Sequence, residues 1–274
     1  MRESNIFPFE VAALGCPHSS NQNSSAFMFT ILGVPLRFYL NNFLDGTILK
    51  VTTWGESHGK ALGAVVDGCP AGLPLCEEDI QIFLDRRKPG QSRYTTARKE
   101  GDLVEILSGV FEGKTTGTPI SLMVRNTDQR SRDYGNIAYS YRPGHADYTF
   151  DQKYGFRDYR GGGRSSGRET IGRVAAGAIA SKILSELNIS LCTYTKSIGP
   201  VQIDTFDPKE INNNAFYMPD AKAATQAGEY LEQCMKNQDS AGGVIECRIS
   251  GVPAGLGDPV FDKLSAVFAH ALMS

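Results

Sequence analysis

The chain has 274 residues, of which 41% are hydrophobic and 21% are charged, and its formal net charge is −2. Such a chain can bury a sizeable core as one large domain or two small ones. A near-neutral charge excludes an overall basic field of the kind that draws proteins to nucleic acid. Six cysteines without a CxxC pair or the spacing of a zinc site predict a reduced, cytoplasmic protein with no disulfide and no structural metal.

Residues 1–43 differ from the rest of the chain. Residues 1–25 are polar and irregular, and the apolar run at residues 27–36 is too short for a transmembrane helix. A signal peptide is the sharper alternative, but the segment has no basic start beyond Arg2 and no clean cleavage site. We expect residues 1–43 to be an appended, disordered segment and residues 44–274 to form the main domain, with no membrane association.

The regular pattern begins with two strands, predicted at residues 47–53 and 61–66. The loop between them reads GESHG and ends in glycine on both sides. A lone histidine in a turn is usually polar surface. The flanking glycines nevertheless indicate a backbone shaped to present Ser57 and His58.

A helix is predicted at residues 77–87, with acids in its first turn and Pro89 and Gly90 after its end. The basic loop that follows carries Arg93, and Arg87 closes the helix, so both guanidinium groups could reach a ligand. The alternative is a solvated basic loop. Further strands are predicted at residues 103–111 and 119–124.

The stretch at residues 141–173 predicts an anion site that contains a proton-transfer group. Three consecutive glycines precede Ser165 and Ser166, which could cap a helix expected at residues 169–187. Free N–H groups at a helix start bind phosphate, and Arg164 and Arg168 stand on either side of the serines. Upstream, the turn RPGHAD carries Arg142 and His145, a residue that exchanges protons near neutral pH.

The remaining pattern predicts strands at residues 190–198 and 243–249 and a helix at residues 221–236. The sequence PAGL occurs at residues 70–73 and again at residues 253–256, each time after a strand and before a helix. The repeat predicts a pseudo-symmetric, layered α+β fold. Because no glycine cap or basic last turn precedes Ser274, we expect a chain truncated at its carboxy terminus.

Four motifs together resemble chorismate synthase in order and spacing: GESHG, RRKPGQSRYTT, RPGHAD and GGGRSSGRET. The resemblance runs from about residue 46 to the end of the chain. It implies a lyase that converts 5-enolpyruvylshikimate 3-phosphate to chorismate and phosphate with reduced FMN (FMNH2), in the shikimate pathway of aromatic amino acid biosynthesis. It also implies a layered β-α-β sandwich and a homotetramer.

The resemblance assigns roles to the motif residues. His58 would protonate the leaving phosphate, and His145 would assist the reduced flavin. The residues that would bind the substrate are Ser57, Arg87, Arg93, Arg142 and Arg168. Those that would bind FMN are Arg164, Ser165 and Ser166. In bifunctional members Arg87 and Arg93 are also associated with NADPH.

Two other readings remain at the level of the sequence. Family members extend past the position of Ser274 and carry further FMN contacts there, so a non-catalytic remnant would bind ligands without turning them over. A nucleic-acid protein could instead use the two arginine-rich stretches to contact phosphates. Such a protein would not need two glycine-flanked histidines, and the compact basic clusters favour a small anionic ligand.

Overall fold

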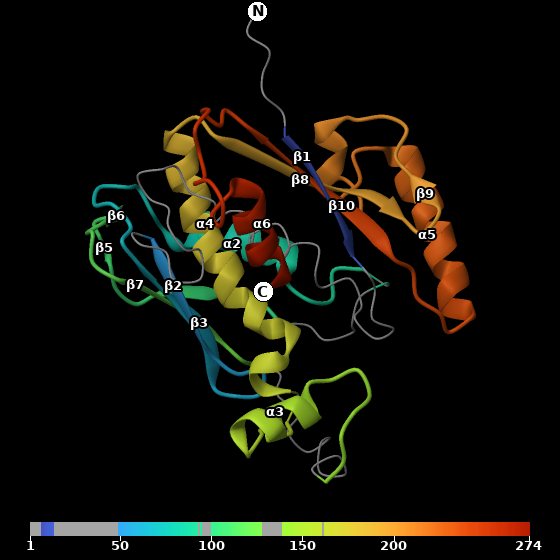
Figure 1. Ribbon diagram of the computed structural model, residues 1–274, viewed down its shortest axis with the longest axis horizontal. Helices are drawn as coiled ribbons and strands as arrows, with labels where there is room; N and C mark the ends of the chain where they lie inside the picture. Colours follow the sequence, from blue (N-terminus) through green and yellow to red (C-terminus); the bar gives the residue numbers. More distant parts are fainter. Residues whose placement is uncertain (1–6, 14–48, 93, 95–99, 128–138, 161) are drawn as a thin grey trace, which may run out of the picture. The chain divides into compact units, whose positions relative to one another are not determined.

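The computed structural model describes residues 7–13, 49–92, 94, 100–127, 139–160 and 162–274. The chain divides into two compact units. Unit 1 comprises Met1–Ser24, Gly90–Ala97 and Leu184–Ala254, and unit 2 comprises Ser25–Pro89, Arg98–Ile183 and Gly255–Ser274. Each unit contains an antiparallel sheet and helices, so the predicted α+β class is confirmed (Figure 1).

Unit 2 is built on a sheet with the strand order β2-β3-β7-β4. Its strands are β2 (Lys50–Gly55), β3 (Ala61–Asp67), β7 (Ile120–Arg125) and β4 (Val104–Ile106). The predicted strand at residues 103–111 is divided, because the chain turns at Gly109 (φ 82°) before the short hairpin of β5 (Val110–Phe111) and β6 (Lys114–Thr115). Alternation along β7 buries Ile120, Leu122 and Val124 on one face.

Helix α2 (Glu77–Arg87) begins and ends where the sequence predicts. Its first turn holds three acids, which favour the positive end of the helix dipole, and Asp79 accepts a hydrogen bond from the backbone N–H of Cys76 at 3.0 Å. The helix buries Ile80 and Leu84 in the core of the unit. This packing places Arg87, in its last turn, inside the unit.

Helix α4 (Thr170–Glu186) lies within a residue or two of the predicted bounds, and two short 3-10 helices that the sequence did not predict precede it, η3 (Gly163–Ser165) and η4 (Gly167–Glu169). The helix lies very close to the sheet of unit 2 at Gly172. A Cβ atom there would stand 2.8 Å from the carbonyl oxygen of Gly63 and 2.9 Å from Cγ2 of Thr53. The contact therefore requires glycine, as the alanine- and glycine-rich sequence of the helix suggests.

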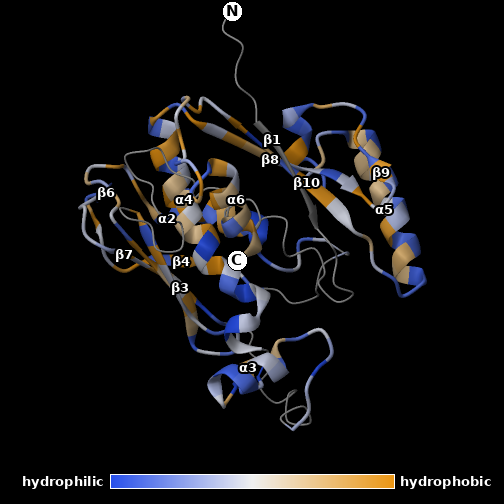
Figure 2. Cartoon of the chain, in the orientation of Figure 1, coloured by the Kyte–Doolittle hydropathy of each residue, from blue (hydrophilic) through white to orange (hydrophobic). Residues whose placement is uncertain are grey.

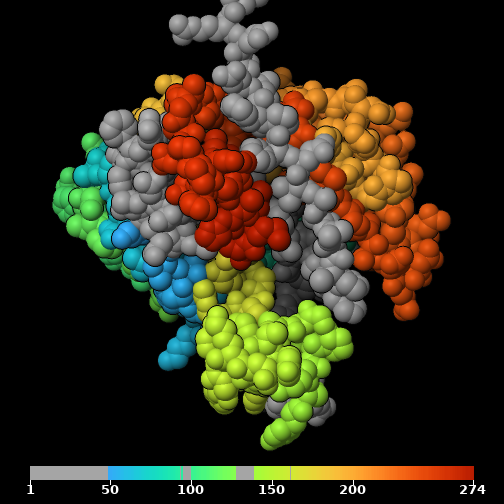
Figure 3. Space-filling view, in the orientation of Figure 1, coloured from blue at the N-terminus to red at the C-terminus, as the bar shows by residue number. Residues whose placement is uncertain are grey.

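Helix α3 (Asp147–Tyr154), which the sequence pattern did not reveal, ends in a left-handed Gly155. It is mostly hydrophilic (Figure 2). The space-filling view shows its segment on the surface (Figure 3), and Tyr148 and Tyr154 are exposed. Asp147 is the one residue of this helix that is buried.

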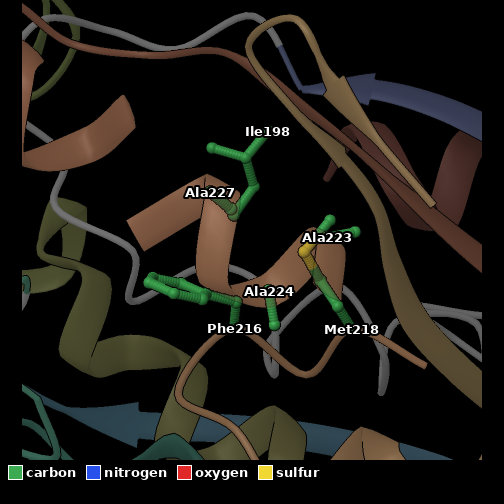
Figure 4. Close-up of a cluster of buried hydrophobic side chains, with 6 residues drawn as sticks. All are labelled: Ile198, Phe216, Met218, Ala223, Ala224 and Ala227. Carbon is green, nitrogen blue, oxygen red and sulfur yellow. The ribbon is translucent and has the colours of Figure 1, made fainter. Parts of the chain in front are cut away.

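Unit 1 contains a sheet with the order β1-β10-β8-β9, formed by β1 (Phe7–Ala13), β10 (Gly243–Ser250), β8 (Ser190–Ile198) and β9 (Val201–Gln202). Helix α5 (Ala221–Lys236) is capped by Asp220, which accepts hydrogen bonds from the backbone N–H groups of Lys222 and Ala223. The 3-10 helix η5 (Pro208–Asn212) precedes it. A hydrophobic cluster of Ile198, Phe216, Met218, Ala223, Ala224 and Ala227 joins α5 to β8 (Figure 4).

Strand β1 corrects part of the interpretation of the amino terminus. Residues 7–13 pair antiparallel with β10, with Phe9 opposite Cys247, where the sequence predicted an irregular segment. The alternation of Phe7, Phe9 and Val11 with other residues is a strand pattern that the polar surroundings obscured. Residues 14–48 lie outside the described part of the chain, and the status of residues 1–43 as an appended segment stays a prediction.

The two PAGL sequences adopt matching backbone conformations. Gly72 has φ 88° and follows β3, and Gly255 has φ 94° and follows β10. The first leads into α2 and the second into α6 (Leu264–Met273). No helix within the described residues is long and apolar enough to cross a membrane.

Candidate functional site

The turn between β2 and β3 presents Ser57 and His58 from within unit 2. Both residues are buried, and Oγ of Ser57 lies 3.1 Å from Nδ1 of His58. The backbone N–H of Gly59 donates to the carbonyl of Glu56 at 3.0 Å and closes the turn. Gly55, at φ 86°, leaves no room for a side chain next to the carbonyl of Ala61. The glycines thus shape the turn, as the GESHG pattern predicted.

Arg87 reaches a buried carboxylate at the start of the segment that leads to β4. Its Nη1 donates to Oδ2 of Asp102 at 2.6 Å, and both side chains have 0% exposure. Its Nε donates to Oγ1 of Thr170 at 3.2 Å. Burial lowers the pKa of Arg87, and the charge of Asp102 acts in the opposite direction. The ion pair therefore allows a guanidinium ion to persist without solvent.

Arg168, in η4, shares this carboxylate with Arg87. Its Nη2 donates to Oδ1 of Asp102 at 3.1 Å and to Oδ1 of Asn126 at 2.9 Å, and it lies 2.8 Å from Oε2 of Glu100. Arg168 and Glu100 are both buried. Two guanidinium groups that the sequence places 81 residues apart thus meet at one aspartate.

The two arginines keep N–H groups that no described residue accepts. They are Nη2 of Arg87 and Nε and Nη1 of Arg168, all buried. A buried donor without a partner costs about 1–3 kcal/mol, so these groups are suited to an acceptor supplied by a ligand. With Asp102 and Glu100 balancing the two positive charges, the cluster has directed donors for an anion at no net charge of its own.

Arg164 lies in the same unit, against the end of β2. Its guanidinium donates to the carbonyl of Gly55 at 3.1 Å and to Oγ1 of Thr53 at 2.7 Å. It also forms an ion pair with Glu169 at 3.4 Å. The arginine thereby ties the glycine-rich segment to the strand that leads into the Ser57–His58 turn.

The two serines differ from the expectation that they cap one long helix. Oγ of Ser165 donates to the carbonyl of Gly162 at 2.7 Å, while Ser166 caps only η4 by accepting from the N–H of Arg168 at 3.4 Å. Gly162 and Gly163 have positive φ angles, of 87° and 52°. These backbone conformations allow two tight 3-10 turns before α4. Arg168, in the second of them, is buried.

Arg142, His145 and Asp147 belong to one turn, which Asp147 closes. The carboxylate of Asp147 accepts from Nε of Arg142 at 2.9 Å, from its Nη2 at 2.8 Å and from its backbone N–H at 3.0 Å. His145 is exposed at the tip, with Nδ1 3.1 Å from the carbonyl of Pro143. The nearby Nη2 of Arg142 lies 3.7 Å from the Cβ position of Gly162. The turn therefore adjoins the glycine-rich segment.

The Asp147 carboxylate leads to a prediction about acid stability. Its hydrogen bonds to Arg142 lower its pKa from 3.8 to about 2. The resulting stabilisation is complete above the unfolded pKa of about 3.9 and is lost as the pH falls through about 2. Asp147→Asn should therefore lower the free energy of unfolding by about 2 kcal/mol at neutral pH, and the difference should shrink below pH 4.

Urea denaturation of the parent and the Asp147→Asn variant across this pH range measures the effect. Asp158→Asn is the matched control, because its partner Arg160 is 45% exposed and exposed pairs contribute about 0–1 kcal/mol. An Asp147→Asn effect that stays constant from neutral pH to pH 3 would contradict the assignment to this carboxylate.

Sequence reasoning missed the residues that organise the arginines. Glu100, Asp102 and Asn126 belong to no motif that was singled out, and the signal available was the pair of acids directly after the basic loop. Arg93, which the sequence predicted as a ligand residue, lies outside the described residues. Of the described part of the chain, no group of three or more side chains is arranged to bind a metal ion. Five described cysteines are free thiols.

Comparisons with known proteins agree on one family. The family model described as chorismate synthase matches residues 49–274. A curated chorismate synthase of Agathobacter rectalis is 70% identical over 231 residues, which are 84% of this chain and 63% of that protein. One of Novosphingobium aromaticivorans is 58% identical over 236 residues, or 85% and 65% of the two chains.

A solved structure titled "Crystal Structure of Chorismate Synthase" superposes with a TM-score of 0.62 at 34% identity, covering 77% of this chain and 60% of that chain. The chain spans less than two thirds of the length of the curated relatives it matches. The comparisons do not favour the alternatives of a non-catalytic remnant or a nucleic-acid protein. The chain belongs to the chorismate synthase family.

Proposed function

We propose that this chain carries the anion-binding part of an active site that eliminates phosphate from 5-enolpyruvylshikimate 3-phosphate to give chorismate. The observation that carries the proposal is the buried pair Arg87 and Arg168, which holds three donor nitrogens without a hydrogen-bond partner among the described residues. A substrate with a phosphate and carboxylates supplies acceptors for such donors. Preorganised donors stabilise the charge that develops on a leaving phosphate.

The chemistry assigned to the chain is the breaking of the carbon–oxygen bond to phosphate together with loss of a ring proton. His58 protonates the departing phosphate, and Ser57, bonded to its Nδ1, fixes the orientation of the ring. Arg142 and Arg93 add positive charge for the substrate anions. His145, exposed on its turn, is free to approach a second ligand, for which we propose the reduced flavin.

The family implies a reduced flavin, and we propose FMN as its form. The residues near Gly162 fit a phosphate-bearing group, because the side chain of Arg164 is 35% exposed and Ser165 is an exposed residue beside two glycines of positive φ. When bound, the reduced flavin supplies electron density to the reaction without net oxidation. Arg164, Ser165 and Ser166 are the residues proposed to hold it.

The other assignments follow the family. NADPH would use Arg87 and Arg93 in a bifunctional member. A homotetramer and a cytoplasmic location are proposed with the activity.

Anaerobic phosphate release from 5-enolpyruvylshikimate 3-phosphate with reduced FMN tests the function. The chain as given is compared with the same chain extended by a homologous carboxy-terminal segment, and a spectral titration with reduced FMN measures binding in each. We expect the extended protein to release phosphate, and Arg168→Gln to abolish most of that release. No release from the extended protein, although it binds reduced FMN, would overturn the proposal.

A further inference from the structure

Asn126 connects the Ser57–His58 turn to the arginine cluster within unit 2. It directly follows β7, and its Nδ2 donates to the carbonyls of Glu56 at 3.0 Å and Gly59 at 2.8 Å. Its Oδ1 accepts from Nη2 of Arg168 at 2.9 Å. The backbone N–H of Asn126 also donates to the carbonyl of Lys60 at 3.1 Å.

These partners define which end of the amide is which. Two backbone carbonyls can only accept hydrogen bonds, and a guanidinium group can only donate them. The amide nitrogen must therefore face the turn, and the amide oxygen must face Arg168. Both N–H bonds of the amide and its oxygen are used, so asparagine satisfies three partners that no other side chain of this length can satisfy together.

We propose that Asn126 is a positioning residue that holds His58 in register with the anion-binding Arg168. The inference rests on the proposed function, which assigns His58 and Arg168 to the same reacting phosphate. Glu56 and Gly59 are the two ends of the turn, so bonds to both carbonyls fix the backbone that carries His58. A proton donor and an anion site must be aligned to about half an ångström to act on one group.

Strand β7, which Asn126 directly follows, is held on both sides in the sheet of unit 2. β7 pairs with β3 on one side and with β4 on the other, and Leu122 and Val124 in it are almost completely buried. Among the described residues, the Ser57–His58 turn has one backbone hydrogen bond across it, from Gly59 to Glu56, and one to the glycine-rich segment, from the N–H of Ser57 to the carbonyl of Gly163 at 3.4 Å. The amide of Asn126 therefore links the end of a central strand to both the Ser57–His58 turn and Arg168.

Two substitutions separate this role from a simple contact with Arg168. Asn126→Asp keeps an oxygen that accepts from Arg168 but places the other oxygen against two carbonyl oxygens. Asn126→Ala removes all three bonds without adding repulsion, and it keeps the test informative if the aspartate variant does not fold. If the hydrogen bonds to the turn determine the rate, Asn126→Asp should lower kcat at least as much as Asn126→Ala.

The first measurement is the kinetics of phosphate release with reduced FMN in the extended protein. We expect both variants to lower kcat by about 100-fold, the loss that follows a displacement of about 1 Å, with KM changed less than about threefold. Asn212→Asp, the same change at an exposed position of η5, should leave both constants unchanged. Near-parent kcat in Asn126→Asp would overturn the inference.

The second measurement does not depend on activity. The chain has four histidines, so the ring signals of a histidine-labelled sample can be assigned by single substitutions. Both Asn126 variants should shift the His58 signal and leave that of His270, an exposed residue of α6, in place. An unchanged His58 signal would refute the positioning role, even if the parent released no phosphate. Conversely, the absence of phosphate release from the parent would count against the proposed function alone.

Discussion

Asp102→Ala should lower the free energy of unfolding by about 3–5 kcal/mol, the usual cost of leaving a buried charge without its partner. Asp102 is the shared counter-ion of Arg87 and Arg168, and its side chain is 0% exposed. Removing it leaves two guanidinium groups close together with Glu100 as the remaining acid of the cluster. Repulsion between the two arginines adds to the lost ion pairs.

Urea denaturation of parent and variant measures this difference. Glu105→Ala is the matched control, because Glu105 lies three residues away and its pair with Arg125 is exposed, at 45% and 66%. That variant should change the free energy of unfolding by less than about 1 kcal/mol. Equal effects of the two substitutions would show that the buried cluster contributes no more than a surface pair.

His145→Ala should reduce the turnover of the extended protein by roughly 100-fold or more, the range for a lost proton-transfer group. The substitution should not disturb the fold, since His145 is exposed and its ring nitrogen Nδ1 lies 3.1 Å from the carbonyl of Pro143, within its own turn. Substrate affinity should change much less, because Asp147 and not His145 holds Arg142.

Steady-state kinetics of phosphate release and the melting temperature test this prediction together. His270→Ala, at another exposed histidine, serves as the control and should have full activity. Retention of most of the turnover by His145→Ala at an unchanged melting temperature would remove His145 from the reaction.

Much of the fold follows from local sequence patterns. Helices α2 and α5 and strand β8 have the predicted bounds, because acidic first turns, a capping aspartate and alternating residues act within a few positions of themselves. The bounds of α4 were predicted to within a residue or two, but the two 3-10 helices before it were not, since they depend on positive φ angles at Gly162 and Gly163. Glycine permits such angles, but the presence of glycine in a sequence does not show that it adopts them.

In the candidate site, the sequence predicts the residues that would contact a ligand but not the residues that hold them in place. Arginine, serine and histidine in glycine-rich motifs indicate the chemistry of an anion site, so Arg168 and His58 could be named from the sequence. Asp102 and Asn126 could not, because they act through partners 66 and 42 residues away in the chain. Contacts of that separation are fixed by the register of β7 and the packing of α4, which no local pattern contains.

Because α4 approaches the sheet closely at Gly172, a side chain added at that position would disturb the arginine cluster. Arg168 precedes α4 by two residues, so the height at which the helix rests on Gly63 and Thr53 sets how far its guanidinium reaches. A single methyl group at position 172 would push the start of α4 away from the sheet, and Arg168 with it. Glycine at position 172 therefore serves the ion pairs of Arg168 through the seating of a helix, although it carries no charge of its own.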